Sequence, residues 1–201
     1  MSNASARRVV LLDSGGANLG SVQAAFARLG VDAPVSSDWN TIRAATHLLL
    51  PGVGAAAAAM ARLRENGLDK LIPTLAQPLL GICIGMQLLF ESSEEGNSEC
   101  LGLLPGSAHK LAPAPGIRVP HMGWNRLQVC SEHPLTAGLD RNWVYFVHSY
   151  AASLSANTVA TSSHGQAFTA IVARDRVMGA QFHPERSSKA GARLLQNFLA
   201  L

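Results

Sequence analysis

Cysteine is scarce in this sequence of 201 residues, which contains only Cys83, Cys100 and Cys130. The number is odd, the three are far apart along the chain, and no C-x-x-C pattern occurs. These features argue against a disulfide framework and against a zinc site. We therefore expect no metal and no cofactor, and we interpret Cys100 and Cys130 as structural.

Charged residues and long apolar runs are also few. Charged residues make up 14% of the sequence, and 16 basic against 13 acidic side chains give a net charge of +3. The basic residues are dispersed, so we expect no nucleic-acid partner. Apolar stretches are interrupted well below the length that crosses a bilayer, and residues 1–6 are too polar for a signal peptide. We expect a cytoplasmic protein without membrane contacts.

The first half of the sequence alternates between short buried strands and amphipathic helices. The turn at 13–17 contains glycines, but the G-x-G-x-x-G pattern of a dinucleotide site is missing. We predict strands at 7–14, near 35, at 47–50 and at 79–82, and helices at 18–30, at 55–66 and from about 84. This order implies right-handed crossovers and an open, mostly parallel sheet with helices on both faces.

The second half changes character. Residues 120–125, PHMGWN, match neither a strand nor a helix. Strands at 143–150, 158–162, 168–173 and 177–182 predict a largely antiparallel section, and a helix at 188–200 closes the chain. Together the two halves predict an α/β fold with an added antiparallel β section, in a single domain over residues 1–201.

The stretch PLLGICIGMQLLF at 78–90 is the most informative one. A buried strand leads into Cys83, and an apolar helix begins near Ile84 with no loop between them. Gly81 and Gly85 flank the cysteine at the spacing of the nucleophile elbow G-x-S-x-G. The helix N-terminus there favours a thiolate. A buried cysteine acting as a small hydrophobic residue is the alternative, and the paired glycines argue against it.

A thiolate nucleophile needs a base, and His183 is the best placed of the seven histidines. It ends a predicted strand, and Glu185 follows two residues later on the same side of an extended chain, where its carboxylate can orient the imidazole. Pro184 ends the strand pairing there. The alternative is a histidine and a glutamate on a solvated loop.

Polar groups near the predicted elbow suggest how a substrate is bound. The turns after residues 12, 50 and 82 should meet at the carboxyl edge of the sheet. The backbone N–H groups of Val53 and Ile84 would then form an oxyanion hole. Gln87 lies one helical turn after Cys83, where its amide either binds a polar substrate or satisfies backbone groups.

Two motifs, GICIGMQLL and, about a hundred residues later, QFHPE, together resemble the class I (triad) glutamine amidotransferases over nearly the whole chain. The resemblance implies that Cys83, His183 and Glu185 form the catalytic triad. PGVG, GGAN, PHMGWN and HSY are further similar to the glutaminase subunits of imidazole glycerol phosphate synthases. Ser14 departs from that branch, which often has an aromatic residue there. The pyridoxal phosphate and anthranilate branches, and a stand-alone cysteine hydrolase or peptidase, are the alternatives.

The resemblance implies hydrolysis of glutamine to glutamate and ammonia through a cysteine thioester. Gly52 and Gln87 would hold the substrate, and the backbone of Ser149 and Tyr150 would recognise its amino-acid end. Ammonia released into water becomes mostly ammonium, which is not a nucleophile. The resemblance therefore implies a heterodimer with a synthase partner, a (β/α)8-barrel cyclase subunit of imidazole glycerol phosphate synthase.

Four polar or aromatic residues are the candidates for the docking face of that partner: Asn18, His121, Trp124 and Asn125. Tryptophan is enriched at interfaces, although a buried core tryptophan is the alternative for Trp124. Val53 lies in a glycine-flanked turn whose peptide can flip, so we expect activity to depend on the partner. A non-catalytic binding module is disfavoured because all three triad residues are present.

Overall fold

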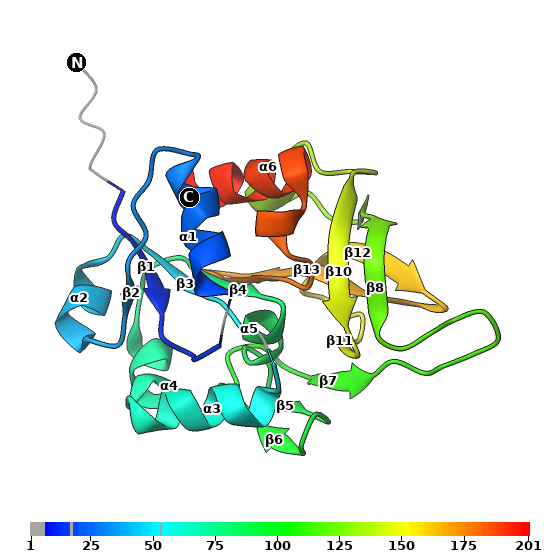
Figure 1. Ribbon diagram of the computed structural model, residues 1–201, viewed down its shortest axis with the longest axis horizontal. Helices are drawn as coiled ribbons and strands as arrows, with labels where there is room; N and C mark the ends of the chain where they lie inside the picture. Colours follow the sequence, from blue (N-terminus) through cyan, green and yellow to red (C-terminus); the bar gives the residue numbers. More distant parts are fainter. Residues whose placement is uncertain (1–6, 17, 53) are drawn as a thin grey trace.

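The computed structural model describes residues 7–16, 18–52 and 54–201, and an eight-stranded sheet forms its centre (Figure 1). The strand order is β2-β1-β3-β4-β14-β13-β12-β9. The strands are β1 (Val9–Leu12), β2 (Val35–Ser36), β3 (His47–Leu50), β4 (Leu79–Ile82), β9 (Gln128–Val129), β12 (Thr158–His164), β13 (Gln166–Arg174) and β14 (Val177–Ala180). Neighbours from β2 to β14 run parallel, and those from β14 to β9 run antiparallel. The predicted fold class is confirmed.

Helices cover both faces of this sheet. In Figure 1, α1 and α6 lie above it, whereas α3 and α4 lie below. The helices are α1 (Leu19–Ala27), α2 (Trp39–Ala44), α3 (Ala56–Glu65), α4 (Leu68–Leu71), α5 (Ile84–Gln87) and α6 (Ser188–Leu199), with short 3-10 turns η1 (Ile72–Thr74), η2 (Pro134–Thr136) and η3 (Pro184–Arg186). The apolar stripe of α6, with Leu194, Leu195 and Phe198, is buried against the sheet, as expected for an amphipathic helix. No helix of the described residues has the length and apolar character needed to cross a membrane.

Two smaller sheets are added to the central one. The first pairs β8 (His121–Arg126) with β10 (Trp143–His148) in an antiparallel ribbon. The second has the order β11-β7-β5-β6, with β5 (Ser92–Ser93), β6 (Ser98–Glu99), β7 (Ser107–Lys110) and β11 (Tyr150–Ala152). The predicted strand at 143–150 thus divides at Ser149 between the two sheets.

The prediction that residues 120–125 form neither strand nor helix is wrong, because they belong mainly to β8. The reason lies in the pattern of exposed and buried residues. Met122 and Trp124 are exposed on one face of β8, whereas His121 is buried on the other. This inverts the usual alternation, in which apolar side chains point inward and polar ones outward.

Candidate active site

Cys83 occupies a strained backbone position between β4 and α5. Its φ of 54° and ψ of −111° lie in a region that residues with a side chain rarely adopt. The neighbouring glycines make the turn possible. A Cβ atom at Gly81 would lie 2.6 Å from the carbonyl oxygen of Gly85, and one at Gly85 would clash with the carbonyl oxygen of Leu50. The predicted elbow is therefore packed tightly against the end of β3.

His183 and Glu185 form a buried pair beside η3. Nδ1 of His183 lies 2.7 Å from Oε1 of Glu185, and the two side chains are 5% and 1% exposed. Asn18, at the start of α1, donates its Nδ2–H to the same carboxylate oxygen at 2.5 Å. The carboxylate accepts the Nδ1 proton, so Nε2 is the imidazole nitrogen left for chemistry. Nε2 has no hydrogen-bond partner among the described residues.

The imidazole of His183 is held in its protonated form. Burial favours the neutral ring, but the neighbouring Cys83 sulfur and the Glu185 carboxylate outweigh it and raise the pKa of His183 to about 10. A protonated imidazole next to a sulfur is the arrangement that activates a cysteine nucleophile.

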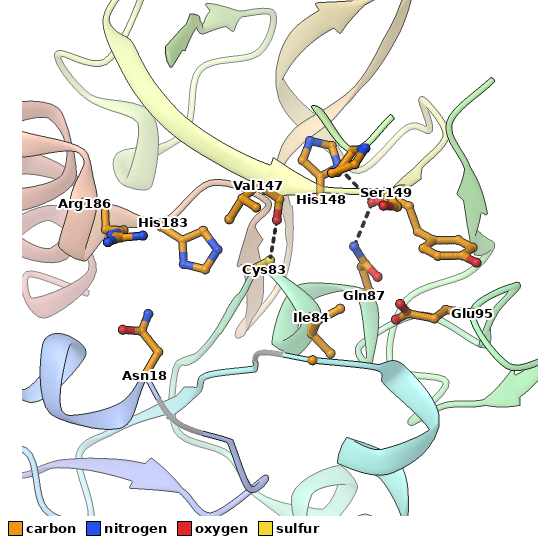
Figure 2. A pocket seen from close by; sticks show the side chains of 13 residues that line it. Asn18, Cys83, Ile84, Gln87, Glu95, Val147, His148, Ser149, His183 and Arg186 are labelled. Atoms are coloured by element: carbon orange, nitrogen blue, oxygen red, sulfur yellow. Dashed lines mark hydrogen bonds between the residues drawn. The ribbon is translucent and has the colours of Figure 1, made fainter. Parts of the chain in front are cut away.

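These groups open onto one cavity of about 580 Å³. On the side of the elbow, the cavity is lined by Cys83, Ile84 and Gln87 (Figure 2). On the side of η3 it is lined by His183, which directly precedes η3, and by Arg186, the last residue of η3. The backbone segment 147–150 lines it from β10 and β11, and the Cys83 sulfur lies 3.8 Å from the carbonyl oxygen of Val147. The cavity is large enough for an amino acid, a typical small-molecule site.

Two buried amides connect the floor of this cavity with the sulfur. Gln87 is fully buried and donates from Nε2 to the Tyr150 carbonyl at 2.8 Å and to Oε1 of Gln181 at 3.1 Å. Nε2 of Gln181 in turn lies 3.7 Å from the Cys83 sulfur. Oε1 of Gln87 is buried and has no partner within the described part of the chain.

Sequence reasoning missed Gln181 and Glu95. Gln181 follows β14 and is fully buried, and an amide two residues before His183 was the available signal. Glu95 lies in a segment that reads as a polar surface loop, yet it lines the cavity. Its Oε2 accepts the backbone N–H of Ala56 at the start of α3, 2.8 Å away.

The remaining predicted residues are distributed unevenly. Ser149 and Tyr150 line the cavity, as expected for substrate contacts. Gly52 packs against the elbow instead, where a Cβ atom would lie 2.5 Å from the backbone nitrogen of Gly85. Val53, the second predicted oxyanion donor, lies outside the described residues. Among those that are described, no group of three or more His, Cys, Asp or Glu side chains is arranged to hold a metal ion.

The predicted docking residues do not form one surface. His121 is only 4% exposed, so its assignment to a docking face is wrong: its ring packs between those of Phe146 and His164. Asn18 faces Glu185 at the cavity. Trp124 is 50% exposed, which excludes the core alternative, and Asn125 is half-buried beside it.

Comparisons with known proteins agree with this geometry. Residues 10–201 match the family model "Glutamine amidotransferase class-I". The chain is 58% identical to the imidazole glycerol phosphate synthase subunit HisH of Xanthomonas euvesicatoria and 55% identical to that of Xylella fastidiosa, in both cases over 96% of this chain and 97% of the relative. A solved glutamine amidotransferase matches 96% of this chain and 97% of its own with a TM-score of 0.74 at 22% identity, which supports the fold.

Proposed function

The chain belongs to the class I glutamine amidotransferase family, and from this premise we propose that it is the glutaminase subunit of an imidazole glycerol phosphate synthase. In this role it hydrolyses glutamine and passes ammonia to a cyclase subunit for histidine biosynthesis. The single observation that carries the proposal is the Cys83–His183–Glu185 arrangement, in which Cys83 and His183 line a cavity of about 580 Å³ and Glu185 holds His183 from behind. The match over residues 10–201 supports a single amidotransferase domain.

The first half-reaction forms a thioester. The Cys83 thiolate attacks the carboxamide carbon of glutamine. The carboxamide oxygen becomes negatively charged and accepts a hydrogen bond from the backbone N–H of Ile84. Ile84 is the first residue of α5, so its N–H has no acceptor within the helix. The N–H of Val53 is the second proposed donor. His183 transfers its Nε2 proton to the departing nitrogen, which leaves as ammonia, while Glu185 retains the Nδ1–H bond.

The second half-reaction restores the enzyme. Neutral His183 removes a proton from water, and the resulting hydroxide adds to the thioester carbon. The carbon–sulfur bond then breaks, which releases glutamate and returns the thiolate beside a protonated imidazole. The donors that serve the first oxyanion serve the second as well, because both steps pass through a tetrahedral intermediate at the same carbon.

The charges of the cavity suit a free amino acid. The carboxylate of Glu95 lines the cavity and can attract the α-ammonium group of glutamine. Oε1 of Gln87 has no hydrogen-bond partner among the described residues, and we propose that a small shift of this side chain lets it accept an N–H of the substrate. The backbone of Ser149 and Tyr150 supplies the remaining contacts, in keeping with the prediction from sequence.

The exposed face of the β8–β10 ribbon supports a docking surface for the cyclase. It carries Met122 and Trp124 from β8 and Trp143 from β10, which are 64%, 50% and 52% exposed. Apolar side chains gathered on an exposed face are typical of an interface. The face continues to the cavity through Arg186, whose guanidinium lies 5.6 Å from the ring centre of Tyr145. Ammonia released from the site would therefore emerge close to the partner.

The test is a synthesis assay on the complex of this chain with its cyclase. We expect Cys83→Ala to abolish synthesis with glutamine as the nitrogen source and to leave synthesis with added ammonia intact. A Cys130→Ala variant is the matched control, because Cys130 is exposed and remote from the cavity. Loss of both activities in Cys83→Ala, or full glutamine-dependent activity, would contradict the proposal.

A further inference from the structure

A chain of buried imidazoles begins at His148 in the cavity wall and runs away from the cavity, and the reaction described above does not use it. Nδ1 of His148 lies 2.9 Å from the carbonyl oxygen of Tyr150, and Nε2 of His148 lies 3.0 Å from Nδ1 of His121. Nε2 of His121 lies 3.3 Å from Nδ2 of Asn125. His148 and His121 are 5% and 4% exposed, so these contacts are shielded from water.

The two ends of this chain fix the direction of every hydrogen bond in it. The Tyr150 carbonyl can only accept, so Nδ1 of His148 carries a proton and, in the neutral ring, Nε2 does not. Nδ1 of His121 must then donate to that bare nitrogen. At the other end, two hydrogen bonds orient the Asn125 amide: its Nδ2 donates to the Ser163 carbonyl, and its Oδ1 accepts from the Arg126 N–H. The atom that faces His121 is therefore Nδ2, which donates to Nε2 of His121. Both ends require the same tautomers.

The surroundings of the two rings keep them neutral. Phe146 stacks on one side of His121 at 4.9 Å between ring centres, and His164 stacks on the other at 4.2 Å. Burial lowers the pKa of His121 to about 4 and that of His148 to about 3. An additional proton would also break a link, because a protonated imidazole has no acceptor.

The far side of the Tyr150 carbonyl connects to the nucleophile. This oxygen accepts from Gln87 as well as from His148, and both bonds are drawn in Figure 2. Gln87 donates to Gln181, and Gln181 approaches the Cys83 sulfur. Asn125, the first donor in this series of hydrogen bonds, is the neighbour of the exposed Trp124 on β8. A continuous set of hydrogen bonds therefore joins the proposed docking ribbon to the reacting sulfur.

We propose that His148 is a positioning residue for glutamine: through a one-directional chain from Asn125 and His121, it holds the Tyr150 carbonyl and the backbone that binds the amino-acid end of the substrate. The proposal rests on the proposed glutaminase function. It assigns His148 no contact with the reacting atoms. Its effect is on where the substrate-binding backbone and Gln87 lie.

Steady-state glutamine hydrolysis by the complex with the cyclase tests this role. His148→Phe keeps a flat apolar ring but loses the donor, and we expect the KM for glutamine to rise about tenfold, the equivalent of one buried hydrogen bond. We expect His148→Asn, whose amide can take the place of Nδ1, to restore most of the affinity. His148→Gln, which reaches toward Nε2 instead, should not restore it.

His47→Phe is the matched control. His47 is also buried, and it packs against Phe198 away from the cavity. We expect it to leave the KM for glutamine unchanged even if it lowers the melting temperature. Equal KM values for wild type and His148→Phe, or equal rescue by His148→Asn and His148→Gln, would overturn the proposal.

A spectroscopic measurement on the wild-type complex covers the case in which the variants fail to fold. Nitrogen-15 NMR of labelled histidine should show His121 and His148 neutral, with the proton on Nδ1 in both. A proton on Nε2 of His148, or a protonated ring at neutral pH, would refute the chain. If wild type hydrolyses no glutamine, the proposed function fails, while the tautomers still decide whether the chain exists.

Discussion

His183 and the pair formed by His121 and His148 are buried to nearly the same extent, yet the protein holds them in opposite charge states. Burial alone favours the neutral ring in all three. His183 faces a carboxylate and a sulfur, and its pKa rises to about 10. The other two face aromatic rings, each other and a carbonyl, and their pKa values fall to about 4 and about 3. The neighbours decide whether a buried histidine transfers protons or holds a backbone in place.

The largest expected effect comes from removing the charged histidine. His183→Gln should lower glutamine hydrolysis at least about 10,000-fold, because the leaving nitrogen then has no proton donor. Glutamine turnover by the complex measures this. Synthesis from added ammonia should persist, and glutamine turnover close to that of wild type would show that another group supplies the proton.

A smaller effect is expected when the carboxylate loses its charge and keeps its shape. Glu185→Gln can still accept the Nδ1–H bond, but it no longer favours the protonated ring, so the pKa of His183 should fall. We expect glutamine hydrolysis to decrease about 1000- to 10,000-fold, because the orienting acid contributes less than the nucleophile or the base. Turnover and an NMR titration of His183 measure the two effects, and an unchanged pKa would contradict this explanation.

The exposed face of β8 should respond differently from its buried face. Trp124→Ala should weaken binding of the cyclase about tenfold, since exposed aromatic residues often dominate an interface. Calorimetry or surface binding gives the affinity. Trp39→Ala is the control, because Trp39 is 38% exposed on α2 and remote from the ribbon. Equal losses in both variants would argue against a docking face at β8.

The smallest effect is the change of the free energy of unfolding with pH. The pair His121 and His148 should make the protein more stable as the pH rises, whereas His183 should make it less stable as the pH rises. Below pH 6.5 the unfolded chain binds more protons at His121 and His148, so stability falls as the pH drops towards 4. Between pH 6.5 and about 10 the folded chain binds more protons at His183, so this contribution fades as the pH rises. Urea unfolding of wild type, His148→Phe and His183→Gln measures these slopes. We expect His148→Phe to make the acid slope shallower without abolishing it, because His121 still contributes, and His183→Gln to reduce the slope above pH 6.5. A slope that is unchanged in its own variant would contradict the assignment.

The parts of the fold and site that follow from local pattern could be predicted from the sequence. Strands 47–50 and 79–82 coincide with β3 and β4, and the spacing of Gly81, Cys83 and Gly85 predicted the elbow. In these segments, burial and steric limits act between residues that are close along the chain. Local rules therefore suffice for them.

The parts that failed depend on partners distant in sequence. His121 looked like a surface residue because its partner, His148, is 27 positions away and pairs with it only across β8 and β10. Asn18 likewise reaches Glu185 across 167 positions. Glu95 sits in a polar loop whose approach to the cavity depends on how α3 and the small sheet pack. No local pattern encodes such contacts.

The most direct test of the account is to look for the covalent intermediate. The complex with the cyclase is mixed with glutamine, quenched with acid during turnover, digested and analysed by mass spectrometry. We expect a glutamyl thioester on the peptide that contains Cys83 in the wild-type complex and no such adduct in Cys83→Ala. Two results would contradict the account. One is glutamine hydrolysis by Cys83→Ala at the wild-type rate, and the other is an adduct on Cys100 or Cys130 instead of Cys83.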